Sequence, residues 1–242
     1  MNAMTPRIAD LWVYLSTSPL LGLTLTLIAY QGAVWVNQRC GGSPLANPVL
    51  IAVTTLVSLL LATGTPYQTY FDGAQFVHFL LGPATVALAI PLYVHFRRVK
   101  AMLLPIVVGL IAGSLTAAFS ALLVAKALGA SVATQLSLAP KSVTTPIAMG
   151  IAERIGGLPS LTAVLVITTG ILGAVAGRYL FDALGVRDPA IRGFATGVTA
   201  HGIGTARAFQ ESEQAGAFSA LAMGMNGLLT ALLLPVLLPL FI

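Results

Sequence analysis

Long apolar stretches, separated by short polar turns, run through the sequence from residue 19 to its C-terminal end. Hydrophobic residues make up 57% of the 242 residues and charged residues only 8%, whereas a soluble domain carries about 25% charged residues. Because so few charges cannot cover a water-exposed surface, lipid must surround much of the chain. The sequence therefore predicts an all-α, polytopic transmembrane protein that forms a single membrane domain over residues 1–242.

Eight apolar segments can be distinguished, and at about 20 residues per spanning helix the chain length allows roughly six to eight crossings. The segments cover residues 19–36, 48–62, 73–96, 101–125, 130–151, 158–177, 193–209 and 215–242. In the fourth segment, the spacing of Gly109 and Gly113 predicts a close helix contact. Residues 1–18 are expected to form an interfacial helix, with Trp12 and Tyr14 at the level of the lipid headgroups.

Two basic clusters constrain the orientation of the chain. They are Arg97, Arg98 and Lys100, and Arg178, Arg187 and Arg192. The positive-inside rule places both clusters in the cytoplasm, which predicts a protein of the inner membrane, and the net charge of +5 then needs no nucleic-acid partner. If segment 130–151 crosses fully, the second cluster lies outside; if this segment is a re-entrant hairpin, both clusters stay inside. We expect the hairpin.

Three of the segments are interrupted by proline, glycine and polar residues. Pro83, Pro140 and a glycine-rich stretch around His201 break the third, fifth and seventh segments. A proline removes a backbone donor and frees a carbonyl group one turn earlier. Because such groups cannot face lipid, we expect the breaks to be buried in protein or to line a cavity.

Two of these breaks are similar in sequence. Residues 81–90 and 138–147 have Leu, Pro, Val and Ile at equivalent positions. This alignment predicts an inverted repeat of about residues 45–100 with about 102–157, followed by C-terminal helices over 158–242. In transporters with inverted repeats, the N-termini of paired half-helices meet at the membrane midplane and form a site for an anion.

The polar residues of the three breaks are candidate contacts for a small carboxylate. They are Gln75, His78, Pro83, Thr85, Lys141, Ser142, Thr144, Thr145, Thr199, His201, Gly202, Gly204, Thr205 and Arg207. Lys141 carries most of this hypothesis, since a lysine within an apolar segment costs at least about 2.5 kcal/mol.

Each of these residues also has a structural interpretation. Lys141 could reach the membrane interface from a segment end, and His201 could be an interfacial loop residue rather than a substrate contact or proton relay. Gln75 and His78 share a helix face and could form a buried pair. Asn226 is expected to join helices within the membrane.

Sequence signatures of soluble enzymes are absent. The chain has no nucleophile elbow, no phosphate-binding loop and no zinc-ligand spacing. We therefore expect no enzymatic activity, no cofactor and no metal site. Cys40 is the only cysteine, which excludes an internal disulfide.

Three motifs follow one another along the chain. They are Gly-Pro-Ala-Thr-Val-Ala-Leu-Ala-Ile-Pro-Leu-Tyr at 82–93, Leu-Ala-Pro-Lys-Ser-Val-Thr-Thr-Pro-Ile at 138–147, and Ala-His-Gly-Ile-Gly-Thr-Ala at 200–206. In this order they resemble the signatures of the LrgB/CidB family. The resemblance implies two alternative functions: holin- or antiholin-like control of murein hydrolase export and cell lysis, or transport of small monocarboxylates. Chloroplast relatives, which resemble the chain in their C-terminal half, exchange glycolate for glycerate, and some bacterial members are linked to pyruvate uptake.

The main expectation from the sequence is a secondary carrier of small monocarboxylates such as glycolate, glycerate or pyruvate. Its expected partners are this carboxylate substrate, a small LrgA/CidA-like membrane subunit, the lipid bilayer and further copies of the chain in a homo-oligomer. The alternative is a holin- or antiholin-like regulator. A holin is expected to be a short hydrophobic hairpin, so eight segments with polar breaks favour the carrier.

Overall fold

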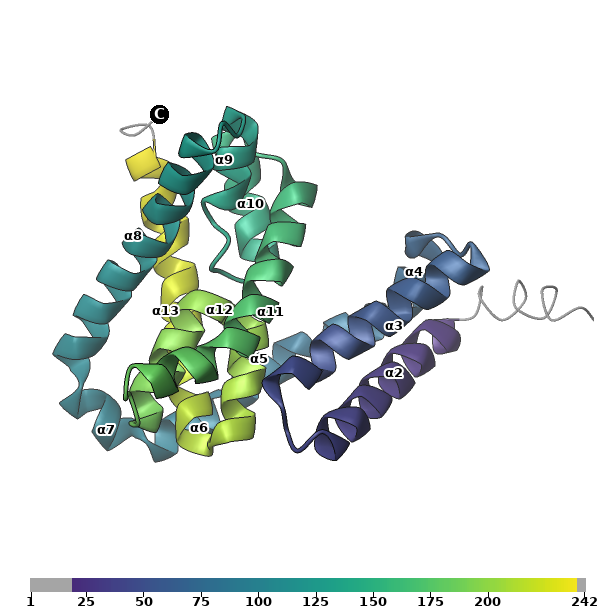
Figure 1. Ribbon diagram of the computed structural model, residues 1–242, viewed down its shortest axis with the longest axis horizontal. Coiled ribbons are helices and arrows are strands. Elements are labelled where there is room, and N and C mark those ends of the chain that lie inside the picture. The colour runs from purple at the N-terminus through teal and green to yellow at the C-terminus, as the bar shows by residue number, and fades with distance from the viewer. Residues whose placement is uncertain (1–18, 239–242) are drawn as a thin grey trace, which may run out of the picture. The chain divides into compact units, whose positions relative to one another are not determined.

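The computed structural model describes residues 19–238, and the elements in this range are helical (Figure 1). In chain order they are α2 (Pro19–Arg39), η1 (Pro44–Ala46), α3 (Pro48–Thr63), α4 (Tyr67–Phe79), α5 (Leu81–Ala87), α6 (Ala89–Val94), α7 (Phe96–Ala101), α8 (Leu103–Ala127), α9 (Val132–Leu138), α10 (Thr145–Ile155), α11 (Pro159–Ala183), α12 (Pro189–Glu211) and α13 (Glu213–Leu237). The predicted all-α fold is confirmed for the described residues. The interfacial helix predicted for residues 1–18 lies outside them.

Several described helices are long and apolar enough to cross a membrane, as expected of a multi-pass membrane protein. Four helices qualify, namely α2, α8, α11 and α13, and a bent pair, Tyr67–Val77 with Gly82–Val94, would add a fifth. This number is below the eight predicted segments because α3 has only 16 residues and three other segments are broken. On α8, Leu104 is 74% exposed and Leu123 is 67% exposed, which suits a helix face in contact with lipid.

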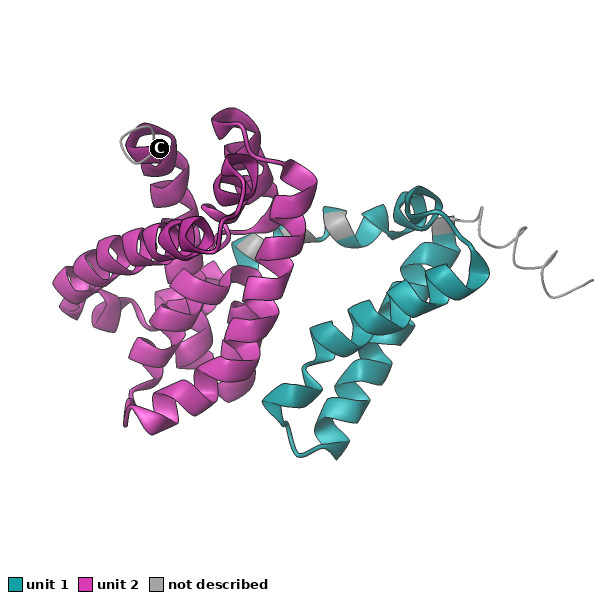
Figure 2. Cartoon of the chain, turned by 45° about the horizontal axis from the view of Figure 1, so that its top comes forward, with its two compact units in different colours: residues 1–87 teal, residues 88–242 magenta. Residues whose placement is uncertain are grey.

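The chain divides into two compact units, residues 1–87 and residues 88–242 (Figure 2). In unit 1, α2 packs against α3 and α4. Gly22 allows the close approach of α2 and α4, since a Cβ atom there would lie 2.6 Å from the carbonyl oxygen of Tyr70. The hydroxyl groups of Thr26 and Tyr70 share a hydrogen bond of 2.7 Å at the same contact. The single membrane domain over residues 1–242 stays a prediction.

Unit 2 contains the same succession of elements twice, a long helix followed by a broken one. Helices α8 and α11 both have 25 residues, and a glycine with positive φ follows each of them, Gly129 at 76° and Gly185 at 67°. Glycine adopts this left-handed conformation without a Cβ clash and thereby ends a helix. Ser131 and Asp188 then cap α9 and α12, because their side chains accept hydrogen bonds from the first backbone N–H groups.

Helices α9 and α10 form the first hairpin. The chain reverses across residues 139–144, and Gly157, just after α10, packs against the backbone of Ser137 in α9. The N–H of Leu158 donates to the Ser137 hydroxyl at 2.8 Å, and the Thr162 hydroxyl donates to the Ser137 carbonyl at 3.0 Å. The beginning of α11 therefore lies beside the end of α9.

Helix α12 forms the second hairpin because it folds back on itself at His201. The backbone there is not helical, with φ at 42° and ψ at −133°. Gly204, in the second half of the helix, packs against Thr196 and Ala200 of the first half. The second half therefore returns toward the end from which the first half starts.

Helix α13 packs backbone to backbone against the first half of α12. A Cβ atom at Gly193 would collide with the carbonyl group of Ala215, and one at Gly197 would collide with that of Ser219. Since residue numbers rise together along this contact, the two helical segments run in the same direction. Ser212, with an extended backbone, is the single residue between α12 and α13.

The two hairpins enter unit 2 from opposite ends. In Figure 1, α9 and α10 lie at the upper end, and α7 lies at the lower end, where α8 begins. Arg98 Nη2 lies 2.5 Å from Asp188 Oδ2, which joins α7 to the loop before α12. Asp182, in the last turn of α11, forms ion pairs with Arg178 and Arg192 at this same end. Both basic clusters thus lie at one end, here called the basic end, as the hairpin interpretation of segment 130–151 requires.

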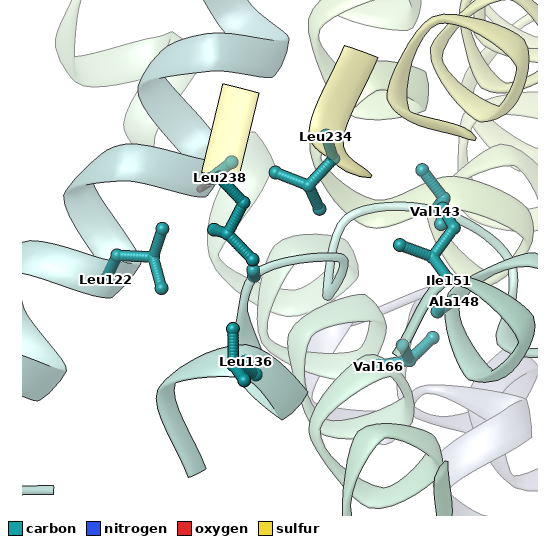
Figure 3. Close-up of a cluster of buried hydrophobic side chains, with 10 residues drawn as sticks. Leu122, Leu136, Val143, Ala148, Ile151, Val166, Leu234 and Leu238 are labelled. Atoms are coloured by element: carbon teal, nitrogen blue, oxygen red, sulfur yellow. The ribbon is translucent and has the colours of Figure 1, made fainter. Parts of the chain in front are cut away.

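An apolar core holds the first hairpin in place. Figure 3 shows side chains from α8, the first hairpin, α11 and the end of α13, including Leu122, Leu136, Val143, Ala148, Ile151, Val166, Leu234 and Leu238. Val143, between α9 and α10, is 1% exposed, and Val166 of α11 is fully buried. Burial of an aliphatic side chain of this size contributes about 1.5–3 kcal/mol, so this core fixes the position of the non-helical turn.

The predicted repeat of residues 45–100 with 102–157 is not confirmed. Pro83 lies inside α5, whereas Pro140 lies in the non-helical turn between α9 and α10. The two prolines therefore break the chain in different ways. The succession that does recur pairs α8, α9 and α10 with α11 and α12, and the repeat inferred from the proline motifs stays a prediction.

Candidate functional site

The tip of the first hairpin places polar groups inside unit 2. Pro140 and Pro146 cannot donate backbone hydrogen bonds, which prevents one continuous helix, and Thr144 has an extended backbone where α10 begins. Ser142 is buried and Lys141 is partly buried. The Lys141 Nζ atom donates to the Ser142 hydroxyl at 3.3 Å.

His201 forms the tip of the second hairpin. Among the described residues it is the only non-glycine residue with positive φ, a conformation that costs about 1–3 kcal/mol. The ring is buried, and its Nε2–H donates to the carbonyl of Val166 in α11 at 3.0 Å. Gly170 makes room for the ring, since a Cβ atom there would lie 2.7 Å from its Cε1 atom. Contact with α11 therefore stabilises the strained backbone.

Asn226, in the middle of α13, connects the two tips. Its Nδ2 atom donates to the Ser142 carbonyl at 3.1 Å and to the Val198 carbonyl at 3.0 Å. The residue is only 1% exposed, and its Oδ1 atom accepts a hydrogen bond of 3.4 Å from Thr230. The prediction that Asn226 joins helices is confirmed. We call the group formed by Lys141, Ser142, His201 and Asn226 the hairpin junction.

Lys141 is the charged member of the hairpin junction. The ion pairs of the described residues do not include Lys141. The junction thus combines one cationic group with neutral hydrogen-bonding groups, an arrangement suited to binding or to conformational control.

A second polar contact joins α12 to α13 one helical turn from the tip. The hydroxyl groups of Thr205 and Ser219 share a hydrogen bond of 2.9 Å. Arg207 lies nearer the basic end, where its Nη1 atom donates to Gln210 at 3.0 Å and its Nε atom lies 3.8 Å from a carboxylate oxygen of Glu211. Thr205 therefore joins the second half of α12 to α13, whereas the contacts of Arg207 stay within α12.

The remaining predicted site residues of unit 2 flank the two tips. Thr144 and Thr145 are partly buried at the start of α10, and Gly202 and Gly204 follow the bend of α12. Thr199 is exposed, and its hydroxyl donates to a carbonyl group of its own helix at 2.8 Å.

The other predicted site residues belong to unit 1. Gln75 is exposed, and its Nε2 atom donates to the carbonyl of Asp72 at 2.6 Å. Pro83 is exposed within α5. His78 and Thr85 lie in α4 and α5, and their side chains are outside the described part of the structure. A composite anion site that joins the breaks at Pro83 and Pro140 stays a prediction.

Three residues of this region were not among the predicted site residues. Asn226 carries a signal in the sequence, since it is a polar residue in the middle of an uncharged apolar segment. Ser219 and Gly170 carry none, because small residues are common in membrane helices. Only the bend at His201 places Ser219 in contact with Thr205 and Gly170 in contact with the imidazole ring.

Unit 2 therefore defines a class of protein, a helical membrane protein in which two broken hairpins meet inside a bundle of long apolar helices. Residues 26–240 match the model of the LrgB-like family, and the chain belongs to the LrgB family. The resemblance to LrgB/CidB proteins is thus confirmed. No solved structure matches the chain.

Several relatives match nearly the whole chain. The uncharacterized protein YwbG of Bacillus subtilis is 39% identical over 90% of this chain and 97% of its own length. The holin-like protein CidB of Staphylococcus epidermidis is 30% identical over 91% of this chain and 96% of its length. The antiholin-like protein LrgB of Bacillus cereus is 29% identical over 92% of this chain and 96% of its length.

These relatives correct the function expected from the sequence. The prediction of a monocarboxylate carrier was wrong, because relatives that match over 96% of their length are named holin-like and antiholin-like. The argument against the alternative was that a holin should be a short hairpin. Proteins with these names are nearly as long as this chain, so the number of segments and their polar breaks do not exclude a holin-like protein.

Proposed function

We propose that this chain is a holin-like or antiholin-like protein of the inner (cytoplasmic) membrane that regulates murein hydrolase export and cell lysis and has no enzymatic activity. The observation that carries this proposal is the match to the holin-like CidB and the antiholin-like LrgB over 96% of their lengths. The exposed apolar faces of α8, α11 and α13 support a role within the bilayer.

The hairpin junction is the proposed centre of this regulation. A regulator needs discrete conformational states, and buried hydrogen bonds in a dry interior favour one geometry over others. The predicted site residues of unit 2 contribute to this junction or flank it. In this proposal they determine how the hairpins are held and make no substrate contact, and no role is proposed for Gln75, His78, Pro83 and Thr85.

We also propose that the chain acts together with a small LrgA/CidA-like membrane subunit and with further copies of itself. Apolar side chains on the outer faces of the described helices are compatible with such contacts, because helices in lipid associate through close packing of small and apolar residues. Leu228 and Leu232 on α13 are 65% and 63% exposed and form one such surface.

The proposal is tested by controlled expression of the full chain in a bacterial host whose own members of the family are deleted. Culture density and extracellular murein hydrolase activity, measured by zymography, report lysis and export. Faster lysis would assign the holin-like role, and slower lysis the antiholin-like role. Unchanged lysis and unchanged hydrolase activity at verified membrane levels would refute both.

A second measurement separates regulation from pore formation. The purified chain is reconstituted into liposomes that contain a large fluorescent dye. We expect the dye to be retained, since Val143, Val166 and Phe218 fill the interior of unit 2. Release of the dye by the chain alone would favour a pore over a regulator.

A further inference from the structure

An apolar groove lies between α8 and the first half of α12. It has a volume of about 450 Å³, which is within the range of sites for small ligands, roughly 300–1,000 Å³. Ile106, Phe194, Val198 and Phe218 line it. The groove belongs to neither the hairpin junction nor the contacts between α12 and α13.

Two glycines of α8 shape this groove. A Cβ atom at Gly109 would lie 3.3 Å from the Phe194 ring, and one at Gly113 would lie 3.1 Å from Val198. The close helix contact predicted from their spacing is therefore confirmed. Larger side chains at both positions would push α8 away from α12 and occupy the wall of the groove.

The groove offers no free polar group to a ligand. Thr199 is the polar residue of its lining, and its hydroxyl donates to the carbonyl of Ala195 in the same helix. From Met102 to Gly113 the groove follows α8 over a rise of about 16 Å. An extended hydrocarbon chain fits a lining of this length and polarity.

Cationic residues lie close in sequence to the end of the groove that Met102 and Ile191 line, here called its mouth. Arg97 and Lys100 lie in α7, five and two residues before Met102, and Arg187 lies two residues before α12 begins at Pro189. All three are exposed, and the ion pairs of the described residues do not include them. The ion pair of Arg98 with Asp188 joins α7, which precedes α8, to the loop that precedes α12.

The mouth also has the side chains of a membrane–water interface. Tyr93 is 82% exposed and Phe96 is 48% exposed beside the cationic residues. Aromatic side chains gather at the level of lipid headgroups, and anionic lipids of the cytoplasmic leaflet attract Lys and Arg there. The mouth and the groove thus match the two parts of a phospholipid.

We propose that this groove binds an anionic glycerophospholipid, with one acyl chain between α8 and α12 and the phosphate between Arg97, Lys100 and Arg187. Charge complementarity indicates an anionic headgroup, since the residues at the mouth are cationic, and the apolar lining indicates an acyl chain. The bound lipid would brace α8 against α12 next to the hairpin junction.

Native mass spectrometry of the delipidated full chain tests the proposal. The chain is titrated with phosphatidylglycerol and with phosphatidylcholine of identical acyl chains. We expect the first phosphatidylglycerol to bind about tenfold to a hundredfold more tightly. The combined substitutions Arg97→Ala, Lys100→Ala and Arg187→Ala should abolish this preference, so that both lipids bind with the same affinity. Equal affinity of the unsubstituted chain for both lipids would overturn the proposal.

Two further variants separate the groove from general surface charge. Lys126→Ala with Arg154→Ala removes two exposed cations at the other end of unit 2, and the lipid preference should stay within twofold. A loss of preference equal to that of the triple variant would refute the site.

Ala195→Phe, which fills the groove, should weaken the first binding step for both lipids. Thr199→Met replaces it if Ala195→Phe does not fold, and undiminished binding by the folded filled variant would refute the acyl-chain site.

The occupant is checked in native membranes. In a Cys40→Ser background, Thr199→Cys carries a photo-crosslinker at the groove. Crosslinks to lipid support the proposal. Crosslinks to another polypeptide, whether a small membrane subunit or a second copy, would overturn it.

Discussion

Asn226 is the residue on which the interior of unit 2 most depends, because one side-chain amide serves two segments far apart in the sequence. Its Nδ2 atom donates to the carbonyl groups of Ser142 and Val198. Without this amide, the carbonyl groups of Ser142 and Val198 would each lose one hydrogen-bond donor inside the protein. An unpaired polar group in a dry interior is costlier than the net worth of the bond itself.

Asn226→Leu should therefore lower the free energy of unfolding by about 1–3 kcal/mol, since interhelical hydrogen bonds in membranes contribute about 0.6–1.7 kcal/mol each. Thermal or denaturant unfolding in detergent measures the loss. Thr199→Val is the control, because its exposed hydroxyl bonds only to its own helix. An equal loss in both variants would contradict a special role for Asn226.

Gly170 and His201 should behave as a coupled pair. Gly170→Ala puts a Cβ atom 2.7 Å from the imidazole, and we expect a loss of about 1–3 kcal/mol from overpacking. In a His201→Gly background the ring is gone and glycine adopts the positive φ freely. The same Gly170→Ala substitution should then cost much less, and a double-mutant cycle by unfolding measures the coupling.

Gly224→Ala provides the comparison for this cycle. Gly224 is exposed on α13, and a Cβ atom added there would meet no other atom within 4 Å. This substitution should raise helix stability by about 0.5–1 kcal/mol. Strict additivity of Gly170→Ala and His201→Gly would mean that the ring does not occupy the space left by Gly170.

At the scale of elements, the sequence predicted the long helices well and the hairpins in part. The apolar segments 101–125 and 158–177 correspond to α8 and α11, because hydropathy alone defines such helices. The prolines around Lys141 predicted the first break. The glycines around His201 predicted a break in this segment but not the reversal of α12. The non-helical backbone of His201 and the contact of Gly204 with Thr196 show that reversal.

The predicted repeat of residues 45–100 with residues 102–157, which is not confirmed, depended on a weak sequence signal. Short apolar motifs share residues by composition, so the alignment of Pro83 with Pro140 carried little information. A better signal lay in Ala-Leu-Gly, which occurs at residues 127–129 and 183–185 and ends both long helices of unit 2. The hydrogen-bond partners of Asn226 in the candidate site could not be predicted from the sequence either, because they follow from three-dimensional packing.

Cysteine labelling tests the two hairpins. In a Cys40→Ser background, Arg187→Cys and Glu213→Cys should react with a membrane-impermeant maleimide from one side of the membrane. Ala130→Cys and Arg154→Cys should react from the other side. If α12 crossed the membrane instead of folding back, positions 187 and 213 would be labelled from opposite sides.

For the whole molecule, the proposed regulation of lysis should depend on the hairpin junction. Expression of the Asn226→Leu variant should change lysis much less than the unsubstituted chain at equal membrane levels, because the junction would no longer favour one geometry. Gly224→Ala, on the same helix, should act like the unsubstituted chain. Culture density after induction measures the difference. Equal effects of all three chains on lysis would show that the hairpin junction has no role in regulation.

The position of Asn226 near the end of the chain has a consequence for biosynthesis. Both hairpins leave the ribosome before α13 does, so their tips enter the membrane before their common donor exists. The hairpins can reach their final positions only after the last helix has been inserted between them. Premature termination before α13 would therefore produce a chain with most of its apolar helices but with neither hairpin secured, a natural target for membrane proteases.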